Sequence, residues 1–250
     1  MLNAREILIA LANKHTGNWH SMFSAIQTRN MDTGDLEKVK TDNRCITIFD
    51  SEYPEVLKTQ CPQSPLVLFY KGDITLLGVK DAIAIVGSRQ PSGEAEMFTD
   101  AFVRNSIASD RVIITPLSVG IGAVSTLAAL ESGHKVIAVL GSGIDYCYPQ
   151  CNKDLYDRII AEGGLVISEY PFNTLPEAQN FTARNRIIAT LANSVCSMEL
   201  SSHSGQILTI DWALNQGKEV YARPNADNAD DFNNRLIDEG AKCLTLSTTL

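Results

Sequence analysis

One loop of this sequence combines residue types that bind phosphate groups. Gly87-Ser88-Arg89 follows a short apolar run and precedes a helical pattern. Gly87 lets the backbone turn sharply, Ser88 can cap the next helix, and the planar guanidinium of Arg89 suits a pair of phosphate oxygens. Unpaired N–H groups at the start of that helix also attract anions. An ordinary turn with a surface arginine is the alternative interpretation.

Two later loops have related features. Gly141 and Gly143 follow another apolar run, where glycines leave a floor of exposed backbone, and Lys153 comes next within reach of a phosphate. Ser204-Gly205 stands where a helix is predicted to begin, which is a second arrangement that attracts anions. The lysine has a simpler interpretation as a solvated residue near a helix start.

The least ordinary segment carries two arginines, Arg184 and Arg186, on either side of Asn185, with Phe181 just before them. An aromatic ring beside guanidinium groups is the combination that stacks on unpaired bases while holding their phosphates. Alternatively, Phe181 packs against the helix start and the arginines pair with nearby acids. Two such acids are Glu177 and Glu199. Both interpretations remain open at this point.

The sequence contains no recognisable catalytic group. His203 is a lone histidine, with no cysteine or carboxylate at a fixed spacing that would activate a serine. There is no Walker lysine, and no G-x-G-x-x-G motif followed by the acidic residue of a nicotinamide site. Cys147 and Cys151 have a C-x3-C spacing without a nearby histidine, which is poor zinc geometry. We therefore expect a binding protein with no catalytic residue, metal or cofactor.

The alternation of apolar and helical segments predicts how these loops are positioned. Strand-like runs occur at 82–86, 112–115, 135–140, 164–168, 194–198 and 219–222. Helix-like segments lie between them at 94–107, 122–132, 153–161, 183–191 and 206–215. This order is typical of βαβ units, so we predict an α/β fold with an extended Rossmann-like, doubly wound and mostly parallel sheet. Ligands bind outside the carboxyl ends of such strands, where these loops begin.

The amino-terminal part has a different pattern. Apolar residues recur at helical spacing through residues 1–40 and are interrupted by the turn Thr16-Gly17-Asn18. This predicts a pair of helices too short to bury a core of their own. We therefore divide the chain into a helical region, residues 1–42, and a Rossmann-like domain, residues 43–250.

Composition limits the possible functions. The 250 residues include 21 basic and 29 acidic ones, a net charge of −8, so attraction of the whole molecule to a polyanion is excluded. Any nucleic-acid binding must come from a local site. No apolar run approaches the ~18–20 residues that span a membrane, and the first residues do not form a secretory signal. We expect a cytoplasmic protein with reduced cysteines.

In their order and spacing, these motifs resemble the DprA/Smf family of DNA-processing proteins. The resemblance covers about residues 45–242 and is collinear. The matching segments are 50–54, 65–72, 84–89, 137–145, 148–153, 168–171, 180–189, 204–205, 217–224 and 233–241.

The resemblance implies a homodimer that binds single-stranded DNA and loads a RecA-type recombinase onto it in natural transformation. It also implies that residues 1–42 occupy the place of a sterile-alpha-motif-like module, or are a remnant of one. The DNA contacts that it implies are Arg89, Lys153, Phe181, Arg184, Asn185 and Arg186. The implied pocket-forming residues are Gly87, Ser88, Gly141, Gly143, Ser204 and Gly205. We expect the cationic and aromatic side chains to converge at one rim of the domain.

The chain departs from the family pattern in the loop after the second predicted strand. Val119, Gly122 and Thr126 stand where arginine, aspartate and histidine are usual, and Ala183 replaces a further arginine. Each lost phosphate contact flattens the log–log salt dependence of single-strand binding by ~0.7, so we expect weaker and less salt-sensitive binding than in a typical relative.

Two other functions are compatible with the fold. One is a nucleotide-binding Rossmann-like protein, either a nucleotide sensor or a phosphoribohydrolase-like enzyme. Residues 202–209 contain a single glycine and no acid, which argues against that catalysis. The other is a structural dimer that contacts a recombinase without binding nucleic acid.

Overall fold

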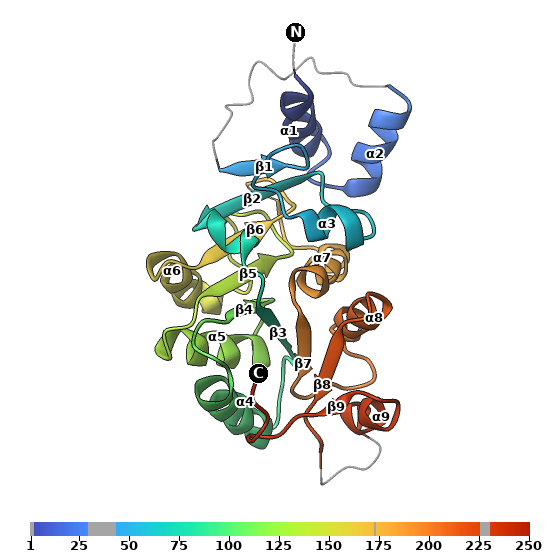
Figure 1. Cartoon of the computed structure of the whole chain (residues 1–250). Coiled ribbons are helices and arrows are strands. Elements are labelled where there is room, and N and C mark those ends of the chain that lie inside the picture. Colours follow the sequence, from blue (N-terminus) through green and yellow to red (C-terminus); the bar gives the residue numbers. More distant parts are fainter. Residues whose placement is uncertain (1–2, 30–43, 173, 226–230) are drawn as a thin grey trace.

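A single sheet runs through the parts of the chain that the computed structural model describes, residues 3–29, 44–172, 174–225 and 231–250 (Figure 1). Its strands are β1 (Cys45–Thr47), β2 (Val67–Gly72), β3 (Ala82–Val86), β4 (Val112–Thr115), β5 (Val136–Leu140), β6 (Leu165–Ser168), β7 (Ser194–Ser197), β8 (Glu219–Ala222) and β9 (Lys242–Cys243). Within the described residues their order is β1-β2-β6-β5-β4-β3-β7-β8-β9. The strands from β3 onward are parallel, whereas β1 and β2 are antiparallel to their neighbours. The predicted mostly parallel, doubly wound sheet is confirmed.

Helices cover both faces of this sheet (Figure 1). One face carries α4 (Gly93–Ser106), α5 (Ile121–Glu131) and α6 (Lys153–Ala161), and the other carries α3 (Glu55–Gln60), α7 (Ala178–Leu191), α8 (Ile207–Asn215) and α9 (Phe232–Asp238). Short 3-10 helices occupy Ile74–Gly78 and Gln150–Asn152. Successive strand side chains point to opposite faces, so Ile83 and Ile85 join one buried cluster while Ala84 and Val86 join the other. Both faces are covered, and the central strands β3 and β5 are accordingly apolar throughout.

The amino-terminal helices α1 (Ala4–Lys14) and α2 (Trp19–Gln27) lie beyond β1 and β2 (Figure 1). Leu8 and Leu11 belong to the same buried cluster as the first face of the sheet. The Arg5 guanidinium also donates to the Asp50 carboxylate, 3.0 Å from Nε to Oδ2. Burial alone would raise the pKa of Asp50, but hydrogen bonds from Thr47 and Arg5 outweigh it and hold that pKa below its usual value. The predicted boundary between residues 42 and 43 lies outside the described residues.

The strand order reverses beside β3. From β3 the chain passes through α4 to β4 on one side, while β7, on the other side of β3, is followed by α8 on the opposite face. The helices that follow β3 and β7 therefore lie on opposite faces of the sheet, which places a crevice at the carboxyl ends of these two strands. No helix in the described part of the chain is long and apolar enough to cross a membrane.

Candidate functional site

A groove of about 910 Å³ lies at the point where the strand order reverses. The loops after β3, β4, β5 and β7 line it together with the first turns of α7. The lining residues with a polar or aromatic side chain are Ser88, Arg89, Gln90, Tyr148, Phe181, Thr182, Asn185, Ser201, His203, Ser204 and Gln206. Of the described residues that line the groove, none is an aspartate or a glutamate. In a chain with a net charge of −8, this groove offers an anion an acid-free surface.

Two aromatic rings and one guanidinium meet at the centre of the groove. The Phe181 and Tyr148 ring centroids are 5.4 Å apart, and the Arg89 guanidinium carbon lies 5.7 Å from the Phe181 centroid. Gly141 makes room for this arrangement, because a Cβ at that position would lie 2.5 Å from Cδ1 of Phe181. Gly141 is not among the described residues that line the groove, but its lack of a side chain leaves room for the Phe181 ring.

The backbone of the loop that carries Arg89 is held by a hydrogen bond and by close packing, whereas the Arg89 side chain is exposed. The Ser88 N–H donates to the Glu199 carbonyl at 2.7 Å, which joins the loops after β3 and β7. Gly87 allows close approach of α5, since a Cβ there would lie 2.6 Å from Cγ1 of Ile121. The exposed Arg89 side chain makes no hydrogen bond or ion pair with any residue that the structure describes. A rigid loop therefore presents an available guanidinium.

Arg184 lies beneath the groove surface rather than on its rim. Its side chain is buried, and Nη1 donates to the Val139 carbonyl and, at 3.0 Å, to the Pro116 carbonyl. Burial and the nearby Arg89 lower the pKa of Arg184 to about 9. With Arg89, Tyr148 and Phe181 it lines a second cavity of about 80 Å³. The expected exposed contact is thus corrected to a buried cation under the aromatic rings.

Asn185, Ser204 and Gly205 form a connection between α7 and the loop after β7. The Asn185 amide donates to the Gly205 carbonyl at 2.8 Å and accepts from Nε of Arg184 at 3.3 Å. The Ser204 hydroxyl accepts from the Gln206 N–H at 3.3 Å, beside the first turn of α8. All three residues line the groove, and the buried amide of Asn185 joins two of its walls through these hydrogen bonds.

Arg186 and Lys153 do not line the groove. Arg186 is buried and pairs with Glu169, 2.5 Å from Nη2 to Oε2, and it also donates to the Gln63 carbonyl. Lys153 forms an ion pair with Asp157, one turn further along α6. The expected convergence of several exposed cations is therefore not what the structure shows, because ion pairs and burial occupy all of them except Arg89.

The alternative interpretation, in which the arginines pair with acids of the protein, holds for Arg186, but its partner is Glu169 rather than Glu177 or Glu199. Glu199 instead accepts the hydroxyl hydrogen of Ser92 at 2.6 Å, and Glu177 accepts from Gln179 at 2.6 Å. Gly143 also lies away from the groove, where its N–H donates to the Thr174 carbonyl at 2.8 Å.

Of the three departures that follow β4, Val119 lies in the loop and Gly122 and Thr126 lie in the first turns of α5. Thr126 is buried and its hydroxyl donates to the Gly122 carbonyl at 2.6 Å. Leu117 has a left-handed backbone with φ of 51°, and its carbonyl accepts from the Asn152 amide at 3.0 Å. Val119 follows on the surface and lines the groove. The position where the family pattern has arginine thus faces the candidate site.

Sequence reasoning did not assign Tyr148, His203 or Gln206 to the site. All three follow the carboxyl ends of parallel strands, β5 or β7, which is the signal that would have found them. The sequence pointed to His203 only as a possible catalytic group. Nδ1 of its ring lies 3.2 Å from Oγ of Ser202.

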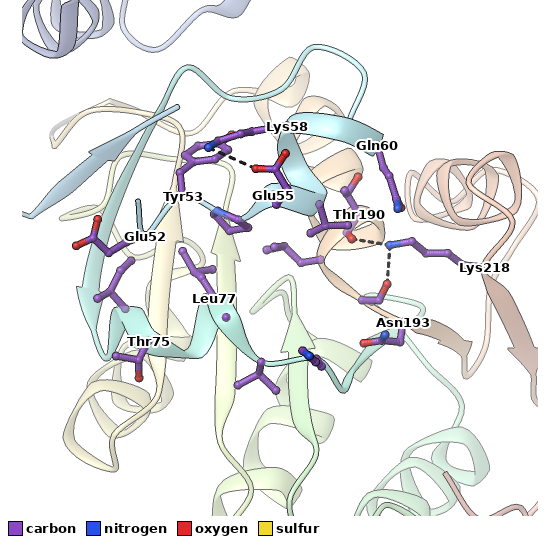
Figure 2. A pocket seen from close by; sticks show the side chains of 18 of the residues that line it. Glu52, Tyr53, Glu55, Lys58, Gln60, Thr75, Leu77, Thr190, Asn193 and Lys218 are labelled. Carbon is purple, nitrogen blue, oxygen red and sulfur yellow. Dashed lines mark hydrogen bonds and ion pairs between the residues drawn. The ribbon is translucent and has the colours of Figure 1, made fainter. Parts of the chain in front are cut away.

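A second hollow, of about 820 Å³, lies at the opposite, amino-terminal ends of the strands (Figure 2). Its lining includes Glu52, Glu55 and Glu219. Figure 2 shows Lys218 directed toward the end of α7, where its ammonium donates to the carbonyls of Ala189 and Ala192 at 2.7 and 2.6 Å. The hollow is also lined by Lys58, which pairs with Glu55, and by Lys80. Its three carboxylates balance its three lysines, so it suits a polyanion less well than the acid-free groove does.

Comparisons with known proteins agree with the motif resemblance. The family model described as DNA recombination-mediator protein A matches residues 44–250. The DNA processing protein DprA of Streptococcus pneumoniae is 38% identical over 201 residues, which cover 80% of this chain and 70% of that protein. Protein Smf of Synechocystis is 35% identical over 204 residues, 80% of this chain, and the chain spans about half of that protein, 51%.

Two solved structures share the fold. The X-ray structure of DprA from Streptococcus pneumoniae superimposes with a TM-score of 0.80 at 32% identity, covering 98% of this chain and 90% of that one. DNA processing protein A from Helicobacter pylori, whose structure describes a single-stranded DNA binding mode of that protein, has a TM-score of 0.72 at 25% identity. That match covers 81% of this chain and 92% of the Helicobacter chain.

Proposed function

Because this chain belongs to the DNA recombination-mediator protein A family, the DprA/Smf family, we propose that its acid-free groove binds single-stranded DNA. The observation that carries the proposal is a guanidinium, Arg89, that lies over the Phe181 ring and has no ion pair among the described residues, with the tilted Tyr148 ring beside it in one groove. Unpaired bases stack on aromatic side chains, and guanidinium groups hold their phosphates. The groove supplies both kinds of contact side by side.

The charge of the groove sets the expected salt dependence. Arg89 is the described lining residue that offers a full positive charge without a partner, so the groove neutralises few phosphates. Each neutralised phosphate contributes ~0.7 to the log–log salt slope for single strands. Base stacking, worth ~1–3 kcal/mol per base, therefore provides most of the binding free energy.

Fluorescence anisotropy with a labelled oligothymidine at several salt concentrations tests this proposal. Phe181→Ala is expected to weaken binding by ~1–3 kcal/mol at every salt concentration, because it removes a stacking surface. Arg89→Ala is expected to flatten the salt slope by ~0.7. There are two matched controls. Phe49→Ala removes an exposed ring that is distant from Phe181 in the sequence. Arg111→Ala removes a guanidinium that pairs with Asp81 at the amino-terminal end of β4.

Two outcomes contradict the proposal. One is wild-type protein that binds no oligothymidine at low salt. The other is a loss of affinity in the two control variants as large as that in the groove variants, which would show that the effect is not located in the groove.

The absence of a carboxylate among the described lining residues supports a binding role over a hydrolytic one. A phosphoribohydrolase-like reaction of the kind considered above uses a carboxylate beside the glycosidic bond, and the titratable side chains among the described lining residues are Arg89, Tyr148 and His203. Incubation with nucleoside monophosphates is expected to release no free base, and base release would reverse the assignment.

We extend the proposal to loading of a RecA-type recombinase onto the bound strand by a homodimer, in natural transformation. Family membership supports this extension. Recombinase ATPase activity on a single strand coated with binding protein should rise when this chain is added. Sedimentation should give twice the 27.3 kDa chain mass. An unchanged ATPase rate or a monomeric mass contradicts the corresponding part.

A further inference from the structure

We propose that the cavity of about 80 Å³ beneath the groove binds a terminal phosphate monoester, the phosphate of a strand end or of a free nucleotide. This inference rests on the proposed function, since it assigns a subsite of the same groove. It goes beyond single-strand binding because an end-phosphate subsite distinguishes strand ends from strand interiors.

The size and lining of the cavity suit one phosphate group. A volume of about 10–15 Å³ holds one water molecule, so 80 Å³ has room for a phosphorus and its oxygens but not for a nucleoside. The lining supplies hydrogen-bond donors from Arg89, Ser118, Tyr148 and Arg184. None of the described lining residues carries a carboxylate, so no group of the cavity repels a dianion.

The buried charge of Arg184 is the strongest evidence for an anion. The side chain is 2% exposed, and no carboxylate among the described residues forms an ion pair with it. Its Nη1 and Nε atoms donate to protein oxygens, whereas Nη2 has no hydrogen bond to any residue described. A buried cation is normally paired, because removing it from water is costly. Burial and Arg89 lower its pKa to about 9, which leaves the guanidinium charged at neutral pH.

The backbone beside the cavity adds further donors. Ser118 and Val119 line the cavity and precede Gly120, the N-cap residue of α5. Their N–H groups donate to no residue in the described ranges, whereas the neighbouring Leu117 and Ile121 N–H groups are both bonded. Unpaired N–H groups before a helix attract phosphate. The helix start therefore supports the same ligand as the buried arginine does.

The position of the cavity favours a terminal phosphate over an internal one. An internal phosphodiester continues on both sides and carries one charge, whereas a monoester has a single link and a charge of about −1.5 to −2 at pH 7. Phe181 lines both the cavity and the groove. A phosphate in the cavity can thus belong to a nucleotide whose base stacks on that ring.

The test compares oligothymidines of one length, labelled at an internal base, that carry a 5′-phosphate, a 3′-phosphate or hydroxyls at both ends. One phosphorylated end is expected to bind about ten- to a hundredfold more tightly than the hydroxyl-ended strand, as for added charge-assisted hydrogen bonds. Arg184→Met is expected to abolish the preference. As a measurement independent of that variant's folding, inorganic phosphate and thymidine monophosphate should each raise the melting temperature of the wild-type protein above chloride at equal ionic strength.

Each result bears on a different statement. Equal affinity for the three strands overturns the end-phosphate subsite and leaves single-strand binding intact. If no strand binds while the monophosphate stabilises the protein, the subsite is supported with a free nucleotide as its source, and the proposed function fails. If neither strands nor phosphates have an effect, both statements are overturned.

Discussion

Replacing Gly141 by alanine tests how the aromatic site is built. The alanine Cβ would lie 2.5 Å from Cδ1, 3.0 Å from Cε1 and 3.1 Å from Cα of Phe181, whereas ordinary contacts begin at 3.4 Å. The ring must therefore move by about 1 Å, because packed side chains do not tolerate such overlap. Its short contacts with Tyr148 and Arg89 would be lost.

The expected loss of oligothymidine affinity is up to the whole stacking contribution of Phe181. That contribution is ~1–3 kcal/mol, which corresponds to roughly five- to 150-fold in Kd. Overpacking of this kind should also lower the free energy of unfolding by ~1–3 kcal/mol. Anisotropy titrations at fixed salt measure the first quantity, and urea denaturation measures the second.

Gly205→Ala is the matched control for this substitution. Gly205 lines the same groove, and a Cβ there meets no atom within 4 Å. This variant should keep wild-type affinity and stability. The double variant Gly141→Ala with Phe181→Ala should bind no more weakly than Phe181→Ala alone, because both changes remove one contact. Wild-type affinity of Gly141→Ala, or additive losses in the double variant, would refute the steric reasoning.

Three further predictions concern charge. Any preference for a phosphorylated end should shrink from pH 7.5 to pH 5 in the anisotropy assay, because the second pKa of a monoester is about 6. Glu169→Gln should lower the free energy of unfolding by ~3–5 kcal/mol, since it leaves Arg186 buried and unpaired, and the double variant Glu169→Leu with Arg186→Met should recover most of that loss in urea denaturation. The folded-state pKa of Asp50 is lower than its ordinary value of 3.8. Its contribution to the free energy of unfolding is therefore complete above pH 3.8 and is lost as the pH falls through the folded-state pKa. Asp50→Asn should therefore lower stability at pH 7 and flatten its decline in acid, as measured by denaturation at several pH values.

Most of the sheet could be predicted because its strands are buried on both faces. Continuous apolar runs bounded by turn residues placed β3, β4 and β8 at their observed bounds. The start of α7 was placed too late, at 183 rather than Ala178. Its first turn, Ala178 to Thr182, lacks the apolar periodicity that identifies a helix, and contacts in the groove hold it instead.

The positions of the site loops could be predicted from the sequence, but the burial or ion pairing of Lys153, Arg184 and Arg186 was not predicted. Arg184 precedes Ile187 and Ile188 by three and four residues, which places it on the buried face of α7. Lys153 and Asp157 have the spacing of a helical ion pair. Both signals were present in the sequence. The partner of Arg186 was not, because Glu169 comes from a different loop and only the fold brings the two together.

The loop after β4 separates its framework from its surface. Leu117 is fully buried in a left-handed backbone conformation that costs roughly 1–2 kcal/mol. Its carbonyl accepts a hydrogen bond from the Asn152 amide. Val119 stands above this framework without taking part in it. For the proposed DNA binding, this means that the residue at position 119 can be exchanged with no remodelling of the scaffold underneath, so evolution can adjust the charge of the groove independently of the fold.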